Sequence, residues 1–120
     1  MTRLALLIVN YNSWSLCAGA IRSFAAPPTV HADGTPMDWQ VLVVDNAAPM
    51  RDAEAEKDVE ALCAQYGGKL IRHDENSGYS KGMNLAYASA TGDWILVSNP
   101  DVRYLAETVN PLLRAMERDP

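Results

Sequence analysis

The sequence has few of the features that mark membrane, nucleic-acid-binding or disulfide-rich proteins. No stretch approaches the roughly 20 apolar residues that a membrane-spanning helix needs. Ten basic residues against fifteen acidic ones give a formal net charge of −5, which argues against nucleic acid as a partner, because phosphate binding needs clustered Lys and Arg. The two cysteines, Cys17 and Cys63, lie far apart and outside any CxxC pattern, so we expect buried thiols in a reducing compartment.

The start of the chain combines one basic residue with an apolar run, so a secretory signal peptide has to be considered. The run ends at Asn10 without a small-residue cleavage site, and it fits a buried strand better. We therefore expect a cytoplasmic protein and leave open a peripheral position at the inner face of the membrane. At 120 residues the chain is expected to form one domain, residues 1–120, with a real core.

Short apolar runs alternate with longer amphipathic segments along the chain. This periodicity predicts strands at 4–9, 39–44, 70–71 and 94–97, and helices at 13–26, at 52–66, from Ser80 to Gly92 and from about Leu105. The apolar helix faces are expected to include Leu16, Ala20, Ile21, Phe24, Val59, Leu62, Met83, Ala86, Tyr87, Leu105, Val109, Leu112, Leu113 and Met116. Strand–helix alternation predicts an α/β fold, a mostly parallel sheet with helices on both faces.

Polar residues follow each of the four predicted strands. They are Asn10-Tyr11-Asn12, Asp45-Asn46, the block 74–84, and Asn99-Pro100-Asp101. In parallel α/β sheets, ligands bind beyond the carboxyl ends of the strands. Each loop alone would also fit a purely structural role, because Asn, Asp and Gly make turns and helix caps. Four such loops on one edge of a sheet favour a single polar cleft.

Two of these loops carry groups suited to a nucleotide. Asp45 follows four apolar residues, and its carboxylate can accept hydrogen bonds from a base NH or a ribose hydroxyl, or cap the following turn. Gly78 and Gly82 would let the backbone approach a ligand, and Lys81 adds a positive charge near the start of a helix that Ser80 can cap. The alternative is a loop whose glycines need no ligand. The spacing is neither a Walker A loop nor the GxGxxG fingerprint.

Asp101 is the candidate metal ligand. Its carboxylate suits Mg²⁺ or Mn²⁺, which take one or two carboxylates and complete their shell with phosphates and water. The alternative is an Asx-Pro turn before a helix. Tyr11 and Trp14 could stack on a base, although Trp14 fits helix packing equally well, and His31 and His73 are expected to be surface or edge histidines.

In this order, the segments 8–12, 43–46, 75–84 and 99–102 resemble the successive motifs of family 2 glycosyltransferases, in particular the bacterial rhamnosyltransferase-like group. The resemblance spans nearly the whole chain, and the block 75–84 with Asn99-Pro100-Asp101 is its most specific part. It implies a Rossmann-like GT-A nucleotide-diphospho-sugar transferase fold and dependence on Mg²⁺ or Mn²⁺. It also implies an inverting transfer from a nucleoside-diphosphate sugar to a glycan, lipid-linked or protein acceptor.

The resemblance further implies roles for individual residues. The nucleotide-sugar-binding residues would be Asn10, Tyr11, Asn12, Asp45, Asn76, Gly78, Tyr79, Lys81, Gly82, Asn84 and Asn99. Asp101 would bind the metal, with Asn99 in place of the first Asp of the family's Asp-x-Asp motif.

The resemblance provides no catalytic base within these 120 residues. In the family the acceptor site and the general base come from a following half, so the base is expected beyond Pro120. We find no candidate for it in this sequence. The chain is therefore expected to be a fragment that is inactive alone.

Two other functions stay open at this point. One is a nucleotide-binding module without catalytic activity, and the other is an unrelated α/β domain whose polar loops only cap helices. A part of a larger fold should also leave apolar surface uncovered. We therefore expect either a homodimer, in which Leu112, Leu113, Met116 or the edge of the sheet is buried against a second copy, or a poorly soluble monomer.

Overall fold

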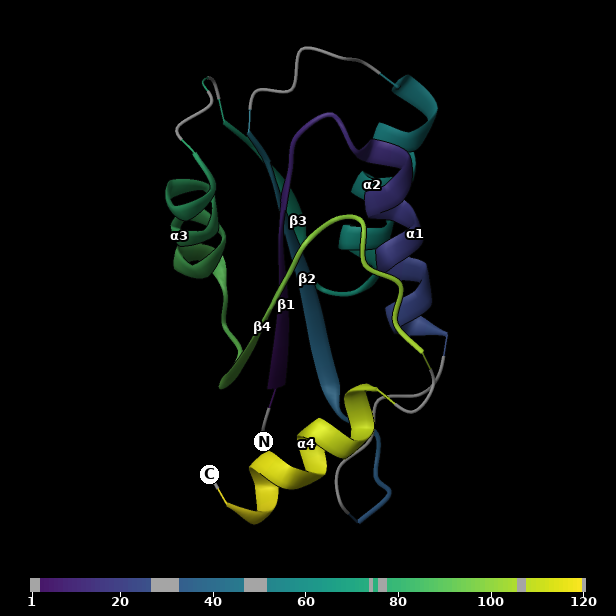
Figure 1. Cartoon of the computed structure of the whole chain (residues 1–120), viewed down its shortest axis with the longest axis vertical. Helices are drawn as coiled ribbons and strands as arrows, with labels where there is room; N and C mark the ends of the chain where they lie inside the picture. The colour runs from purple at the N-terminus through teal and green to yellow at the C-terminus, as the bar shows by residue number, and fades with distance from the viewer. Residues whose placement is uncertain are drawn as a thin grey trace.

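The computed structural model describes residues 3–26, 33–46, 52–73, 75, 78–105 and 108–119. Strands and helices alternate through this part of the chain. The elements are β1 Arg3–Asn10, α1 Trp14–Ala25, β2 Asp38–Asn46, α2 Ala53–Gln65, β3 Lys69–His73, α3 Tyr79–Ser89, β4 Trp94–Ser98 and α4 Val109–Arg118. The strands form one parallel sheet in the order β3-β2-β1-β4 (Figure 1). The predicted α/β fold with a parallel sheet is confirmed.

Helices cover the sheet from both sides. Figure 1 shows α1 and α2 on one face and α3 on the other, while α4 lies across the end of the sheet where the strands begin. Side chains of β1 alternate between the two layers: Leu4, Leu6 and Ile8 join the core beneath α1 and α2, whereas Ala5 and Leu7 pack toward α3. This two-sided burial is the reason why β1 and β2 are continuous apolar runs.

Two predicted helix starts are wrong. Helix α3 begins at Tyr79 after the N-cap residue Gly78, so Ser80 lies inside the helix and does not cap it. Gly78 has φ +89°, a backbone conformation that glycine adopts readily and other residues do not. The last helix begins at Val109 instead of Leu105. The segment before it is held against α1, because the backbone NH of Tyr104 donates to the hydroxyl of Ser23 at 2.8 Å.

Several predicted core positions are exposed. Leu16, Tyr87, Leu105, Leu112 and Met116 all point largely to solvent. The other predicted positions on these two helices are buried: Ala20, Ile21 and Phe24 on α1, where Cys17 takes the place expected for Leu16, and Val109 and Leu113 on α4. The apolar side chains of α4 are thus covered on one side of the helix only.

Both cysteines are buried free thiols, as predicted. Burial raises the pKa of Cys63 to about 12, and it raises the pKa of Cys17 still further, with a smaller contribution from the neighbouring Cys63. Both side chains therefore stay protonated at neutral pH. Protonated thiols are poor nucleophiles and poor metal ligands, so the cysteines serve as small core residues.

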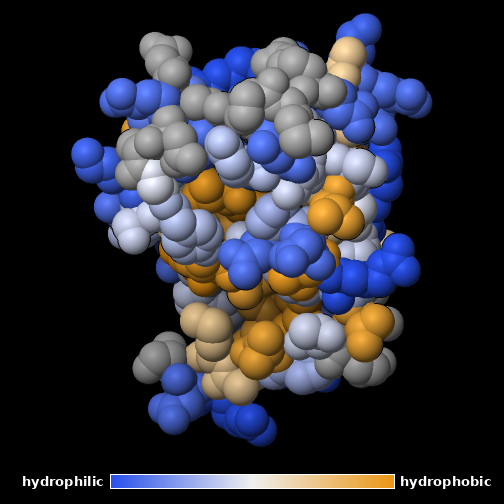
Figure 2. All heavy atoms as spheres, turned by 45° about the horizontal axis from the view of Figure 1, so that its top comes forward, coloured by the Kyte–Doolittle hydropathy of each residue, from blue (hydrophilic) through white to orange (hydrophobic). Residues whose placement is uncertain are grey.

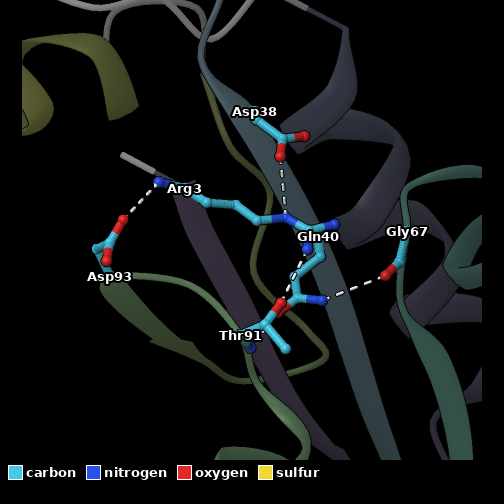
Figure 3. Close-up of polar contacts among 6 residues, drawn as sticks. All are labelled: Arg3, Asp38, Gln40, Gly67, Thr91 and Asp93. Carbon is cyan, nitrogen blue, oxygen red and sulfur yellow. Dashed lines mark hydrogen bonds and ion pairs between the residues drawn. The ribbon is translucent and has the colours of Figure 1, made fainter. Parts of the chain in front are cut away.

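A polar network closes the end of the sheet where the strands begin. Its members are Arg3, Asp38, Gln40, Gly67, Thr91 and Asp93 (Figure 3). The buried amide of Gln40 accepts from the NH of Thr91 at 2.7 Å and donates to the carbonyl of Gly67 at 3.2 Å. The guanidinium of Arg3 donates to Thr91 at 2.8 Å. These hydrogen bonds and ion pairs join strands β1 and β2 to the α2–β3 and α3–β4 connections, and give this end of the sheet a structural role.

The longest helix in the described part of the chain, α2, has 13 residues. A helix that crosses a bilayer needs about 20. None of the described helices meets the length and hydropathy that a membrane span requires.

Candidate functional site

The carboxyl ends of the strands meet at one edge of the sheet. Asn10 of β1 pairs in register with Asp45 of β2, which pairs with Arg72 of β3. One residue further along β2 and β3, Asn46 pairs with His73. Asn10, Asp45, Asn46 and His73 therefore lie at a common edge of the sheet, at the end opposite the network around Gln40.

Asn10 and Asp45 turn toward the layer of α1 and α2, because they continue the alternation of Ile8 and Val43, which pack in that layer. The side chain of Asn10 is completely buried, and neither its Oδ1 nor its Nδ2 has a hydrogen-bond partner within the described part of the chain. Leaving a buried polar group unsatisfied costs about 1–3 kcal/mol. An unsatisfied amide at the end of a core strand is the kind of group that a ligand or an ordered water satisfies.

Asp45 lies beside a partly buried charge cluster that sequence reasoning missed. Its side chain is 7% exposed, and its Oδ2 lies 3.9 Å from Nη1 of Arg72, which also lies 3.6 Å from the buried Glu56 of α2. The Arg72 guanidinium stands 6.0 Å from the centre of the Trp14 ring. Trp14 itself is buried in the core, so the helix-packing alternative holds for this residue and base stacking does not.

The start of α3 is fixed against the ends of β1 and β2. The Nδ2 of Asn46 donates to the carbonyl of Gly78 at 3.1 Å. A Cβ added at Gly82 would lie 3.0 Å from Cγ1 of Val9, a tight contact, so this glycine allows the helix to approach the sheet closely. Gly82 therefore has a packing reason to be glycine that is independent of any ligand.

A pocket of about 380 Å³ opens at this edge. It is lined by Val9, Tyr11, Asn46, Gly78, Tyr79, Asn99 and Pro100. Four of the predicted site residues, Tyr11, Gly78, Tyr79 and Asn99, are thus brought together from three separate loops. Both tyrosines are about half exposed. Figure 2 turns this end of the molecule toward the viewer; hydrophilic side chains gather toward the top and sides of the view, and apolar ones in its middle and lower part.

Other predicted residues lie elsewhere. Lys81 and Asn84 line a separate pocket of about 270 Å³, together with His73, Glu75 and Leu85. The structure therefore divides the predicted donor site into two pockets that share helix α3. Asn12 lies in the β1–α1 turn with φ +56°.

Two sequence predictions fall on positions that the structure does not test. Asn76, a predicted donor contact, lies outside the described residues, and so does Pro120, beyond which the general base is expected. The described part of the chain ends at Asp119, after α4. The position of the base therefore stays a prediction.

Asp101 and Asn99 are exposed on either side of Pro100, which lines the larger pocket. Among the described residues, no three His, Cys, Asp or Glu side chains are grouped as a metal-binding cage. A single carboxylate with a neighbouring amide oxygen does match the needs of Mg²⁺ or Mn²⁺ when phosphates supply further oxygens. The donor set therefore fits a metal that is bound together with a diphosphate.

The parallel sheet with helices on both faces and a pocket at its carboxyl edge defines an α/β domain of the Rossmann-like type. The chain belongs to glycosyl transferase family 2, whose sequence pattern matches residues 5–120. This membership rules out the alternative of an unrelated α/β domain. It leaves the assignment to the rhamnosyltransferase-like group as a prediction.

Known proteins with similar sequences agree with this assignment. The chain is 26% identical over 81 residues to a dolichol-phosphate mannosyltransferase of Pyrococcus furiosus, an alignment that covers 68% of this chain and 22% of that protein. It is 24% identical over 86 residues to an uncharacterized glycosyltransferase of Haemophilus influenzae, covering 72% and 27%. The matched regions thus amount to about a quarter of the length of these relatives.

Solved structures of glycosyltransferases share the fold. TarS residues 1–349 of S. aureus superposes with a TM-score of 0.73 at 22% identity, covering 92% of this chain and 31% of that one. The same protein in complex with UDP gives a TM-score of 0.71 at 20% identity, covering 92% and 30%. The mannosyltransferase PcManGT of Pyrobaculum calidifontis, in complex with GDP-Man and Mn²⁺, gives 0.71 at 18% identity, covering 97% and 32%. The predicted GT-A fold is confirmed.

Proposed function

We propose that this chain binds a nucleoside-diphosphate sugar at the carboxyl edge of its sheet and forms the donor-binding part of a glycosyltransferase. The observation that carries the proposal is the pocket that gathers Tyr11, Gly78, Tyr79 and Asn99 beside Asp101. In a member of glycosyl transferase family 2, a pocket at this edge is the expected place for the donor.

The nucleoside is proposed to lie over the ends of β1 and β2. The buried amide of Asn10 has hydrogen-bonding groups without partners among the described residues, and the carboxylate of Asp45 can accept from a base NH or a ribose hydroxyl. Tyr11 follows Asn10 directly and is exposed enough to stack on a base. Asn12 completes the turn that carries Tyr11.

The diphosphate is proposed to lie between the start of α3 and the Asn99-Pro100-Asp101 turn. Backbone NH groups at a helix start favour an anion, and Gly78 lets the chain approach it. Lys81 and Asn84, which line the neighbouring pocket, would contact the donor from the side of β3. Asn99 and Asp101 would hold Mg²⁺ or Mn²⁺, which neutralises the diphosphate and stabilises charge on the departing nucleotide. The local basic groups and the metal offset the net charge of −5.

The transfer itself is proposed to proceed with inversion to a glycan, lipid-linked or protein acceptor. Inversion by direct displacement needs a general base within hydrogen-bond reach of the acceptor hydroxyl. Among the described residues we assign no such base, and we propose that it lies beyond Pro120. The 120 residues are therefore proposed to bind the donor without transferring its sugar.

The two buried free thiols suit a reducing compartment. We propose that the protein acts in the cytoplasm. A peripheral position at the inner face of the membrane is one arrangement that this location allows.

Calorimetric titration of UDP, GDP and dTDP into the chain, with Mn²⁺ and then with EDTA, tests donor binding. We expect one nucleotide to bind with a Kd in the micromolar to millimolar range, about −4 to −8 kcal/mol, and EDTA to weaken it. The nucleotide that binds names the base. A folded chain that binds none of them, with or without metal, would overturn the proposal.

The homodimer stays a prediction. Leu113 is buried within the chain, whereas Leu112, Met116 and, on the edge strand β4, Val97 are exposed. Exposed apolar side chains at a sheet edge and on a neighbouring helix favour self-association. We expect light scattering to give twice the monomer mass at high protein concentration, and Leu112→Glu to lower it. A monomer under all conditions would contradict the prediction.

A further inference from the structure

The turn Asn99-Pro100-Asp101 stands at the end of an edge strand. Among the described strands, β4 pairs with β1 on one side and with none on the other. The ladder between β1 and β4 ends at the pair of Ile8 and Ser98, just before the turn. The described residues 102–105, which follow the turn, belong to no helix or strand. Since the sheet fixes the turn from one side only, its place beside the pocket depends on what holds the chain after it.

Tyr104 attaches the chain after the turn to the core. It is partly buried, whereas Arg103 and Leu105 on either side of it are exposed. The Tyr104 ring packs edge to face on Phe24 of α1, with the ring centroids 5.3 Å apart. Burial raises the pKa of Tyr104, and a hydrogen bond with the side chain of Ser98 lowers it in part. Tyr104 thus connects α1 with the residue that precedes the turn.

Ser23 of α1 holds the backbone of Tyr104. The NH of Tyr104 donates to the hydroxyl oxygen of Ser23 at 2.8 Å. The Ser23 hydroxyl in turn donates to the carbonyl of Ala20 at 2.8 Å. Because a serine hydroxyl has one hydrogen and two lone pairs, the bond to Ala20 uses the hydrogen and leaves a lone pair for the Tyr104 NH. Hydrogen bonds in such a chain strengthen one another.

Helix α1 is a firm support for this bond. Its side chains Ile21 and Phe24, on either side of Ser23 in the sequence, are buried in the core. The helix starts at Trp14, shortly after Tyr11, which lines the larger pocket. Figure 1 shows the chain after β4 turning toward α1 and running beside it. One helix therefore connects the β1 loop of the pocket with the segment that follows the β4 turn.

We propose that Ser23 is a positioning residue of the metal and diphosphate site: through Tyr104 it holds the turn so that Asp101 meets an ion bound to the diphosphate. This inference rests on the proposed function, because it takes Asp101 as the metal ligand. Ser23 acts through the backbone, since Tyr104 follows Asp101 by three residues. It contacts neither the donor nor the ion.

Ser23→Ala removes the acceptor of the Tyr104 NH. The segment after the turn then takes several positions, and the Asp101 carboxylate meets the ion less often. We expect the Kd with Mn²⁺ to rise about fivefold to tenfold, at the lower end of the effect of residues that support a metal ligand. The Kd in EDTA should change less than about twofold. Calorimetric titration with UDP, GDP or dTDP, whichever binds the wild-type chain, measures both values.

Three further variants separate positioning from general support of the fold. Ser15→Ala, the same substitution at an exposed position of α1, is the matched control and should leave both Kd values unchanged. Ser23→Thr keeps a hydroxyl that bonds to the same helix carbonyls, so it should bind within about twofold of wild type. In the Asp101→Ala background, Ser23→Ala should change the Kd less than about twofold, because no carboxylate remains to be positioned.

Hydrogen exchange tests the inference in the wild-type chain, without any variant. An ion at Asp101 and the bond from Tyr104 to Ser23 restrain the same turn, so each should stabilise the other by linkage. The Tyr104 amide should exchange about fivefold more slowly with nucleotide and Mg²⁺ present, and less than about twofold more slowly with nucleotide and EDTA. The Thr91 amide, which donates to Gln40 at the opposite end of the sheet, is the reference and should not respond to Mg²⁺.

The outcomes are distinct. A loss limited to the titrations with Mn²⁺, its rescue by Ser23→Thr and the slower exchange at Tyr104 support the inference. Equal losses with Mn²⁺ and with EDTA, no loss beyond that of Ser15→Ala, or exchange at Tyr104 that Mg²⁺ leaves unchanged would overturn it while donor binding stands. Wild-type binding that EDTA does not weaken would also overturn it. A wild-type chain that binds no nucleotide would remove the proposed function and this inference with it.

Discussion

Replacement of Asp101 by Ala should abolish the metal-dependent part of nucleotide binding. Asp101 is exposed beside Asn99 and Pro100, which line the larger pocket, and it is the carboxylate of this turn. Without it, the ion keeps its contacts to the diphosphate and water but has no charged protein ligand. We expect the Kd measured with Mn²⁺ to rise about 100-fold, close to the wild-type value in EDTA.

Asp119→Ala is the matched control, because Asp119 is an exposed aspartate at the end of α4, outside the site. It should leave the Kd unchanged in both conditions. If Asp101→Ala binds the nucleotide as tightly as wild type with Mn²⁺, and the wild type remains sensitive to EDTA, the metal is held by other residues and the assignment of Asp101 fails.

Gly68→Ala should strongly destabilise the chain. A Cβ at this position would lie 1.7 Å from the backbone carbonyl oxygen of Val41 in the central strand β2. The contact is with backbone, so no side chain can rotate away, and the turn from α2 to β3 must shift. We expect a loss of about 4 kcal/mol or more, which is a large share of the about 5–15 kcal/mol that stabilises a domain. Urea unfolding followed by circular dichroism measures it.

Gly19→Ala is the control for glycine substitution. Gly19 lies inside α1, and a Cβ there would meet no atom of the described residues within 4 Å. Alanine at an open helical position should raise stability by about 0.5–1 kcal/mol. A Gly68→Ala chain with near wild-type stability would show that the close approach of the α2–β3 turn to β2 is wrong.

The sheet could be predicted because local sequence determines it. The continuous apolar runs at 4–9 in β1 and 41–44 in β2 reflect burial on both faces, and this signal needs no knowledge of partners. The same reasoning located the ends of the strands, and with them the polar residues that come next in the sequence. Helix boundaries were less predictable. Leu105 has the spacing of a helical residue, but the bond between Tyr104 and Ser23 holds its segment against another helix.

The loops that meet at the carboxyl edge could be predicted from the sequence, whereas their arrangement could be predicted only in part; the roles of their residues stay a prediction. Tyr11 and Asn99 come from loops far apart in the sequence, and parallel strands explain why they share a pocket. Lys81 and Asn84 lie outside that pocket because of the orientation of α3 on the sheet. Two contacts fix this orientation: the close approach of Gly82 to β1 and the hydrogen bond from Asn46 to the start of the helix. Such contacts leave no local pattern.

The cluster of Glu56, Arg72 and Asp45 was missed for a related reason. Glu56 lies in a helix segment rich in charge, where one more glutamate is expected at the surface. Only the pairing of β2 with β3 shows that Arg72 stands opposite Asp45. Once the strand pairing is known, the register that places Arg72 beside Asp45 is the signal that points to this cluster.

The central claim is that the carboxyl edge of the sheet binds the donor nucleotide. Amide NMR spectra of the chain, recorded as the nucleotide is added with Mg²⁺, test it most directly. The account predicts shifts at residues 10–12, 45–46, 78–82 and 99–101, with the network around Arg3, Gln40 and Thr91 unmoved. Shifts concentrated at that opposite network, or saturation with no change at the carboxyl edge, would contradict it.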